Sequence, residues 1–387
     1  MKKFLALALA LAMTLGLVAC GEKTATTSPS ASSETSASAS GSAKALKIAI
    51  VTSPSGVDDG SFNQACFEGI QNFIKDHPDC TVKAIQETDI ANSVNAVSQI
   101  VADYDVIVTP GYQFGGITQL AKDNPSKYFI LVDSYPTDPD DSTKSVEVDN
   151  INAMLFAEQE SGFFAGITAA METKTGKVAV VNGQAFPSNI NYQYGFEAGV
   201  NYANAKLSTK AQCIEIASYA GTDNAKKNVG GNYIGSFTDP ETGKVVGKAL
   251  IDQGVDVLFV AAGNSGNGVF TAAKEAKDVK VIGCDTDQYK DGENGSSNIV
   301  LTSVLKNMGV NIVRQLNAIL DGSFKGSNDL LKADTDSTGY VSEAGHQQLS
   351  DKTLAALKDA YEKVKSGEIV PPDSTSTETV DNFKGLK

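Results

Sequence analysis

From residue 46 onward, short apolar runs alternate with segments in which apolar residues recur every three or four positions. Runs such as 46–52 and 105–109 are apolar at almost every position, which is typical of strands in a parallel sheet covered on both faces. We predict strands at 46–52, 82–85, 105–109, 127–133, 177–182, 213–219, 257–261 and 279–284. The helices we predict are 61–76, 93–104, 117–123, 153–171, 190–205, 242–253 and 268–276.

This alternation occurs twice, so it predicts an α/β protein with two Rossmann-like lobes, each built on a parallel sheet with helices on both faces. Segment 299–325 reads as a strand and a helix that return to the first lobe. We expect one lobe to hold 45–150 plus about 300–325, and the other to hold 151–299 plus about 326–370. Residues 371–387 form an acidic tail.

The first 44 residues have a different pattern. Met1-Lys2-Lys3 precedes an apolar stretch over 4–18, which is the pattern of a secretory signal and is too short for a membrane span. The stretch ends in small residues directly before Cys20, as in bacterial lipoprotein signals, which implies removal of residues 1–19 and acylation of Cys20. The alternative is an ordinary signal peptide with an incidental cysteine. Residues 20–44 are rich in Ser, Thr and Ala and predict a flexible tether.

Charge and composition exclude several function classes. The chain has 387 residues and a net charge of −14, so we expect no binding to a nucleic-acid polymer. There is one arginine, Arg314, and only two histidines, which argues against phosphorylated ligands and His-rich metal sites. None of the cysteines forms a C-x-x-C pair, so we favour buried free thiols over a disulfide. No cofactor motif and no common hydrolase motif occurs.

In open α/β sheets, ligands bind beyond the carboxyl ends of the strands. The first such loop, 52–63, carries Asp58 and Asp59 and then Ser61, Phe62 and Asn63. Adjacent carboxylates rarely face each other, so we interpret Asp59 as a group that fixes the loop or accepts from a ligand, and not as half of a catalytic pair. Phe62 points either into the cleft or into the core, and Asn63 offers both donors and acceptors.

The segment VTSPSGVDDGSFNQACFEG resembles the basic membrane protein family of lipoproteins, the solute receptors that include purine nucleoside receptors of ABC importers. Further blocks match in order, among them DVIVTPGYQFGG, QESGFFAGITAAM, YIGSFTDPETGK, VLFVAAGNSGNGVF and LTSVLKNM. The resemblance covers the body to about residue 340. It implies a type I periplasmic-binding-protein fold with a hinge between the lobes.

The resemblance also implies a ligand site. Two phenylalanines that match Phe62 and Phe237 would hold a base between them. Asn63 would meet the edge of the base, where Ser53 replaces the family's aspartate and leaves purine specificity open. Asp285 and Lys306 would meet the ribose, with Gly263 allowing close backbone approach. The full set of expected ligand-binding residues is Ser53, Asp59, Phe62, Asn63, Gly111, Asp133, Phe237, Gly263, Asp285 and Lys306.

Three of these residues also have a purely structural interpretation: Asp285 as a loop cap, Lys306 as a solvated helix charge and Phe237 as lobe core. We expect a monomeric solute-binding protein of an ABC importer, held to the extracytoplasmic side of the cell membrane by lipid on Cys20, that closes on a nucleoside and meets a permease. The alternatives are a receptor for another flat or sugar-like solute, or a surface enzyme acting on a nucleoside. Turnover of the ligand would distinguish the enzyme from a receptor.

Overall fold

The computed structural model describes residues 45–387. The predicted signal, Cys20 and the tether lie outside the described residues. The described residues belong to one compact unit, Ala43–Lys387, and all that follows concerns it. Within 45–387, no helix combines the length and the apolar character needed to cross a bilayer.

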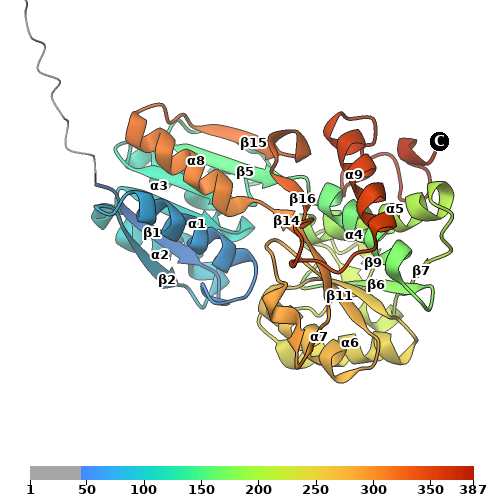
Figure 1. Ribbon diagram of the computed structural model, residues 1–387. Helices are drawn as coiled ribbons and strands as arrows, with labels where there is room; N and C mark the ends of the chain where they lie inside the picture. The colour runs from blue at the N-terminus through green and yellow to red at the C-terminus, as the bar shows by residue number, and fades with distance from the viewer. Residues whose placement is uncertain (1–44) are drawn as a thin grey trace, which may run out of the picture. The chain divides into compact units, whose positions relative to one another are not determined.

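The first lobe is built on a six-stranded parallel sheet in the order β15-β5-β4-β3-β1-β2 (Figure 1). Its strands are β1 (Lys47–Thr52), β2 (Thr81–Gln86), β3 (Val106–Pro110), β4 (Tyr128–Val132), β5 (Ile151–Phe156) and β15 (Ser327–Leu331). Its helices are α1 (Phe62–Asp76), α2 (Ser93–Ile100), α3 (Thr118–Asp123) and α8 (Met308–Asp321). Helix α8 packs beside α1 on one face, where Ile70 and Phe73 join Ile312 and Leu316 in one apolar core.

The second lobe is built on the sheet β16-β14-β11-β10-β6-β7, which is parallel except for β16. Its strands are β6 (Lys177–Asn182), β7 (Gln212–Cys213), β10 (Val257–Ala261), β11 (Lys280–Gly283), β14 (Val300–Lys306) and β16 (Thr338–Tyr340). Its helices are α4 (Glu158–Glu172), α5 (Pro187–Lys206), α6 (Pro240–Asp252), α7 (Gly263–Glu275) and α9 (Asp351–Lys365). Two small hairpins, β8 (Gly221–Thr222) with β9 (Asn228–Gly230) and β12 (Glu293–Asn294) with β13 (Ser297–Asn298), lie outside this sheet.

The predicted helix 153–171 is wrong at its start. Residues 151–156 form β5, and the helix α4 begins only at Glu158. The sequence hides this boundary because α4 is buried almost all round, so no polar stripe marks where it begins. Its glycines allow this burial: a Cβ on Gly166 would lie 2.0 Å from the Phe196 carbonyl oxygen of α5. The predicted strand 213–219 is also wrong, because β7 stops at Cys213.

The chain crosses between the lobes three times, at Ala157, Asn307 and Lys332. The sheets therefore correct the expected lobe boundaries: strand β5 belongs to the first lobe and strand β14 to the second. Strand β15, expected in the second lobe, forms the edge of the first sheet. Backbone bonds tie the crossings together, since Ala157 N–H donates to the Leu331 carbonyl and Asn307 N–H to that of Ser337.

The acidic tail is packed against the second lobe. Phe383 is fully buried, with its ring centroid 6.0 Å from that of Phe163 in α4. Cys66, Cys80, Cys213 and Cys284 are free thiols, and all except Cys213 are buried, which confirms the preference over a disulfide.

Candidate functional site

A cavity of about 590 Å³ lies between the two lobes, at the carboxyl ends of the strands of both sheets. All ten residues predicted from the sequence line it: Ser53, Asp59, Phe62, Asn63, Gly111, Asp133, Phe237, Gly263, Asp285 and Lys306. They come from loops that are far apart in the chain and meet because parallel strands end at one edge of each sheet. We call this cavity the cleft.

The loop after β1 is held by one carboxylate. Asp59 is 2% exposed, and its Oδ1 accepts from the backbone N–H groups of Ser61 (3.1 Å) and Gln64 (3.0 Å). Its Oδ2 accepts from the backbone N–H of Asn63 (3.0 Å) and from the Asn63 side-chain amide (2.9 Å). Burial raises the pKa of Asp59, and the backbone N–H groups oppose that rise. Asp59 therefore acts on the loop, with its oxygens occupied by protein donors.

These bonds also orient Asn63. Its amide nitrogen donates to Asp59 and, at 3.1 Å, to Ser53 Oγ. Within residues 45–387, its Oδ1 is buried and meets no hydrogen-bond donor. A buried carbonyl oxygen without a donor costs free energy unless something else supplies one. Asn63 therefore presents a fixed acceptor in the wall of the cleft.

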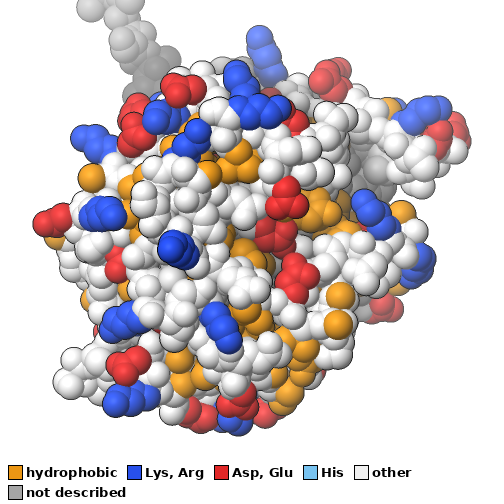
Figure 2. Space-filling view, turned by 90° about the vertical axis from the view of Figure 1, so that its right-hand side faces the viewer, with side chains coloured by type: hydrophobic (Ala, Val, Ile, Leu, Met, Phe, Trp, Pro, Cys, Tyr) orange, Lys and Arg blue, Asp and Glu red, His pale blue; other side chains and the backbone are white. Residues whose placement is uncertain are grey.

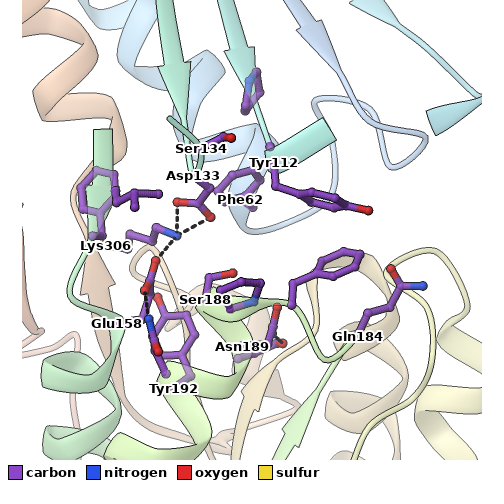
Figure 3. Close-up of a pocket in the computed structure, with 18 of the residues that line it drawn as sticks. Phe62, Tyr112, Asp133, Ser134, Glu158, Gln184, Ser188, Asn189, Tyr192 and Lys306 are labelled. Carbon is purple, nitrogen blue, oxygen red and sulfur yellow. Dashed lines mark hydrogen bonds and ion pairs between the residues drawn. The ribbon is translucent and has the colours of Figure 1, made fainter. Parts of the chain in front are cut away.

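Lys306 is the cation of the cleft wall and is 2% exposed. Its Nζ lies 2.6 Å from Asp133 of the first lobe and 2.9 Å from Glu158 Oε1 at the start of α4. Figure 3 shows the ammonium between these two carboxylates, one above it and one below. Lys306 is thus not the solvated helix charge of the structural interpretation, because it bridges the two lobes at a crossing of the chain.

Burial and charge act in opposite directions in this cluster. Burial raises the pKa of Asp133 to about 7, and Glu158 adds to the rise, while the Lys306 ammonium opposes it. For Lys306, burial disfavours the charged form, but the carboxylates of Asp133 and Glu158 outweigh it and raise its pKa above the usual value. Lys306 is therefore charged at any physiological pH, and the cluster has more carboxylates than cations.

Asp285 follows β11 in the second lobe, and its charge also acts on Lys306. Its carboxylate accepts from Ser61 Oγ across the cleft at 2.6 Å and from the Tyr192 hydroxyl at 2.9 Å. These bonds go to side chains of other elements, so Asp285 is more than a local loop cap. Asp133 and Asp285 both have positive φ, 62° and 68°. Non-glycine residues with such backbone geometry concentrate at functional sites.

Aromatic side chains form another part of the cleft wall. Phe62 lies in the wall with its ring centroid 5.2 Å from Lys306 Nζ. In the second lobe the Phe237 ring lies 5.8 Å from that of Phe186, and Phe186 lies 4.3 Å from Tyr112 of the first lobe. Gly183 makes room for Phe237, because a Cβ there would lie 2.2 Å from the Phe237 ring. Phe237 is thus a cleft residue and not lobe core.

Direct contacts join the lobes around this cavity. Gln288 donates its side-chain N–H to the Gly60 carbonyl at 3.0 Å, and Ser55 Oγ donates to the Phe237 carbonyl at 3.4 Å. Together with the Tyr112–Phe186 ring contact and the Ser61–Asp285 bond, they place the facing loops within bonding distance.

Several cleft residues were missed from the sequence. Glu158 lies inside the predicted helix 153–171. A predicted strand that ended at Phe156 would have placed Glu158 just beyond the end of a strand, where ligands bind. Tyr112 and Phe186 lie after the predicted strands 105–109 and 177–182, but no sequence feature singles out either residue. The tail residues Asp373, Ser374 and Thr375 also line the cleft, and no sequence pattern indicated that the tail returns there.

Comparison with known proteins gives consistent results. The family model described as "ABC transporter substrate-binding protein PnrA-like" matches residues 46–223 and 217–375. The chain is 30% identical over 342 residues to the ABC transporter nucleoside-binding protein BmpA of Lactococcus lactis, covering 83% of this chain and 86% of that protein. It is 29% identical to the CD4+ T-cell-stimulating antigen of Listeria monocytogenes, covering 84% and 88%.

Solved structures agree on the fold. An ABC transporter solute-binding protein from Aeropyrum pernix superposes with a TM-score of 0.70 at 21% identity, covering 85% of this chain and 94% of that one. A solute-binding protein from Conexibacter woesei gives 0.62 at 21% identity, covering 85% and 99%. These matches confirm the predicted periplasmic-binding-protein fold. With the family model matching most of its length, the chain belongs to the Bmp family of PnrA-like substrate-binding proteins of ABC transporters.

Proposed function

We propose that this protein is a lipid-anchored receptor that captures a nucleoside in the cleft and delivers it to the permease of an ABC importer. The observation that carries this proposal is the composition of the cleft wall. Aromatic rings from both lobes line it together with the Lys306, Asp133, Glu158 and Asp285 cluster. A nucleoside combines a flat heterocycle, which stacks on aromatic rings, with a sugar whose hydroxyls bond to carboxylates and ammonium groups.

In this proposal Phe62 and Phe237 stack on the base, and Ser53 and Asn63 bond to its edge. Asp133, Asp285 and Lys306 hold the sugar, while Gly111 and Gly263 keep the adjacent backbone close to the ligand. The name of the Lactococcus lactis relative, a nucleoside-binding protein, supports the ligand class. Asp59 has a positioning role, because its oxygens are bonded to its own loop.

Charge argues against a phosphorylated ligand. The cleft wall has one lysine against several carboxylates, so a phosphate would meet net negative charge. The arginine, Arg314, lies on α8, where it donates to the Asn311 side chain. On the face shown in Figure 2, Lys and Arg side chains stand singly among acidic ones, so that face offers no continuous basic track for a nucleic-acid polymer.

The connections between the lobes support capture by lobe closure. Three crossings at Ala157, Asn307 and Lys332 form a hinge, and the loops opposite it are joined by a few hydrogen bonds and one ring contact. Such an arrangement opens by small backbone changes at the crossings and closes around one small ligand. Acylation of Cys20 would hold the receptor at the outer side of the cell membrane, near its permease. We infer that it releases its ligand unchanged and is not an enzyme.

The experiment is titration calorimetry on residues 44–387 with inosine, guanosine, adenosine, cytidine and ribose. We expect one-to-one binding of at least one nucleoside. Phe62→Ala should weaken it about 10-fold or more, since base stacking on an aromatic ring contributes about 1–3 kcal/mol. The control is Phe324→Ala, which removes a first-lobe phenylalanine that does not line the cleft. Absence of heat with every nucleoside would refute the proposed ligand class and leave the family assignment intact.

A further inference from the structure

The C-terminal tail follows helix α5 from the cleft to the far end of the second lobe. Ser374 N–H donates to Asn191 Oδ1 at 2.9 Å, next to the cleft. Further along, the Asn201 amide donates to the Val380 carbonyl at 2.9 Å, and Lys206 Nζ to the Lys387 carbonyl at 3.0 Å. The three contact points ascend in the same order in helix and tail, so the tail lies along α5 as a strap with turns in it, and its Phe383 side chain is buried.

At its cleft end the strap is part of the cavity wall. Asp373, Ser374 and Thr375 line the cleft beside Asn191. The Asp373 carboxylate accepts from the backbone N–H and the hydroxyl of Thr375, both at 2.8 Å, so this turn has a defined shape. The family model ends at residue 375, and the anchoring points on Val380, Phe383 and Lys387 lie beyond it.

A chain of hydrogen bonds leads from the strap to the cation of the cleft. Ser374 N–H occupies Asn191 Oδ1, which turns the Asn191 amide nitrogen toward Glu158 Oε2 at 3.1 Å. Glu158 Oε1 then lies 2.9 Å from Lys306 Nζ, whose other partner is Asp133. If Ser374 were removed, Asn191 Oδ1 would lose its donor, and nothing would then hold the Asn191 amide in the orientation that points its nitrogen at Glu158. Glu158 would then keep only the lysine as a fixed partner.

We propose that residues 373–387 are a working part of the ligand site, and that Asn191 is a positioning residue that couples this strap to Glu158 and Lys306. The strap keeps the Glu158 carboxylate aligned on Lys306 before the ligand arrives, so less ordering is needed on binding. This inference rests on the proposed function for its affinity readout. It assigns a role in affinity to residues 373–387, a segment that contains none of the expected ligand-binding residues.

The test compares three variants of the full-length chain by calorimetry with whichever nucleoside the wild-type protein binds. Asn191→Ala breaks the link with the strap in place, and we expect the Kd to rise about 10-fold, the effect of one hydrogen bond to a charged group. A stop codon after Thr375 removes the anchors and should raise it at least as much. Asn204→Ala is the matched control: it removes an asparagine of the same helix that bonds to Thr209 and Ala211 and not to the strap, and should change the Kd less than 2-fold. Equal Kd values for the wild type and Asn191→Ala would overturn the inference.

A second readout does not depend on the ligand. In hydrogen exchange on the free protein, the stop after Thr375 and Asn191→Ala should both accelerate exchange in 158–163, at the start of α4, whereas Asn204→Ala should not. Unchanged exchange in 158–163 would overturn the coupling even where affinity changes. If wild-type protein binds no nucleoside, the proposed ligand class fails, and this exchange result alone decides the role of the strap.

Discussion

Two groups of buried acidic side chains in this protein differ in whether a cation lies beside them. In the cleft, Asp133 and Glu158 share the Lys306 ammonium. Between α5 and the segment after β7, Glu197 faces Glu215, and the charges that act on its carboxyl, those of Glu215 and Asp381, are both negative. Burial raises the pKa of Glu197 to about 8, and Glu215 adds to the rise.

The difference shows what the lysine contributes. The Lys306 ammonium opposes the rise that burial causes in the pKa of Asp133, which reaches about 7, so above that pH Asp133 is a charged acceptor facing the cavity. Without a cation, a carboxyl keeps its proton near neutral pH and its burial becomes a pH-dependent term in stability. The first arrangement suits a ligand site, and the second affects only the fold around it.

The largest expected effect comes from removing the cation. Lys306→Met leaves Asp133 and Glu158 buried without a cation, and we expect a loss of about 3–5 kcal/mol in the free energy of unfolding at pH 8. Denaturant titration measures it. The loss should be smaller at pH 5, below the pKa of Asp133, because that carboxyl is then protonated and needs no cation.

A matched control is Lys365→Met, which removes a lysine paired with Asp336 on the surface at 2.7 Å. Solvent screens such pairs, so stability should hardly change. Similar losses for the two variants would show that Lys306 does not have a special role.

A smaller effect, on the pH dependence of stability, is expected at Glu197, which faces Glu215. Glu197 keeps its proton up to about pH 8 in the folded state but loses it near its ordinary pKa of 4.5 when unfolded. The folded state therefore binds the extra proton between these values, so its stability falls as pH rises from 4.5 to 8. Glu197→Gln mimics the protonated form, and should raise Tm by about 3–6 °C at pH 9 and leave it unchanged at pH 4.5.

Thermal unfolding of wild type and Glu197→Gln at pH 4.5, 7 and 9 tests this. Glu275→Gln, at an exposed carboxylate paired with Lys244, is the control and should show no pH-dependent gain. A constant gain for Glu197→Gln across the range would indicate better packing and not titration.

The smallest effect concerns affinity. Asp133 loses its proton at about pH 7, and a charged carboxylate accepts more strongly from a sugar hydroxyl than a neutral one. Nucleoside affinity should therefore rise about 3–10-fold between pH 6 and pH 8, and Asp133→Asn should flatten that dependence. Calorimetry at both pH values measures it; an equally steep dependence in Asp133→Asn would assign the titration to another group.

Much of the lining of the cleft could be predicted from one topological rule. Because ligands bind at the carboxyl ends of parallel strands, the expected residues were placed at loops such as 52–63, and all of them line the cleft. The resemblance supplied which residues within each loop to name. Their roles in binding remain proposals that the experiments above test.

The other features of the fold and the cleft have no periodic pattern in the sequence that could predict them. Strand β15 reads Ser-Asn-Asp-Leu-Leu, an edge strand with no apolar alternation, so its place in the first sheet could not be seen. The boundary between β5 and α4 is hidden because both are buried on all sides. The tail owes its position mainly to three buried residues, Pro371, Pro372 and Phe383, and to hydrogen bonds between its backbone and side chains of α5, which composition does not predict.

The position of β15 also has a consequence for how the molecule is made. Strand β15 pairs with β5, yet their paired residues are separated by 175 positions, as at Asn152 and Ser327. A nascent chain that has exposed β1 to β5 still lacks the edge strand of their sheet and helix α8, which covers α1. The first lobe therefore cannot finish folding while the chain is being synthesised, and native pairing waits until nearly the whole polypeptide is available. In the proposed exported receptor, this delay favours a chain that is still translocation-competent when synthesis ends.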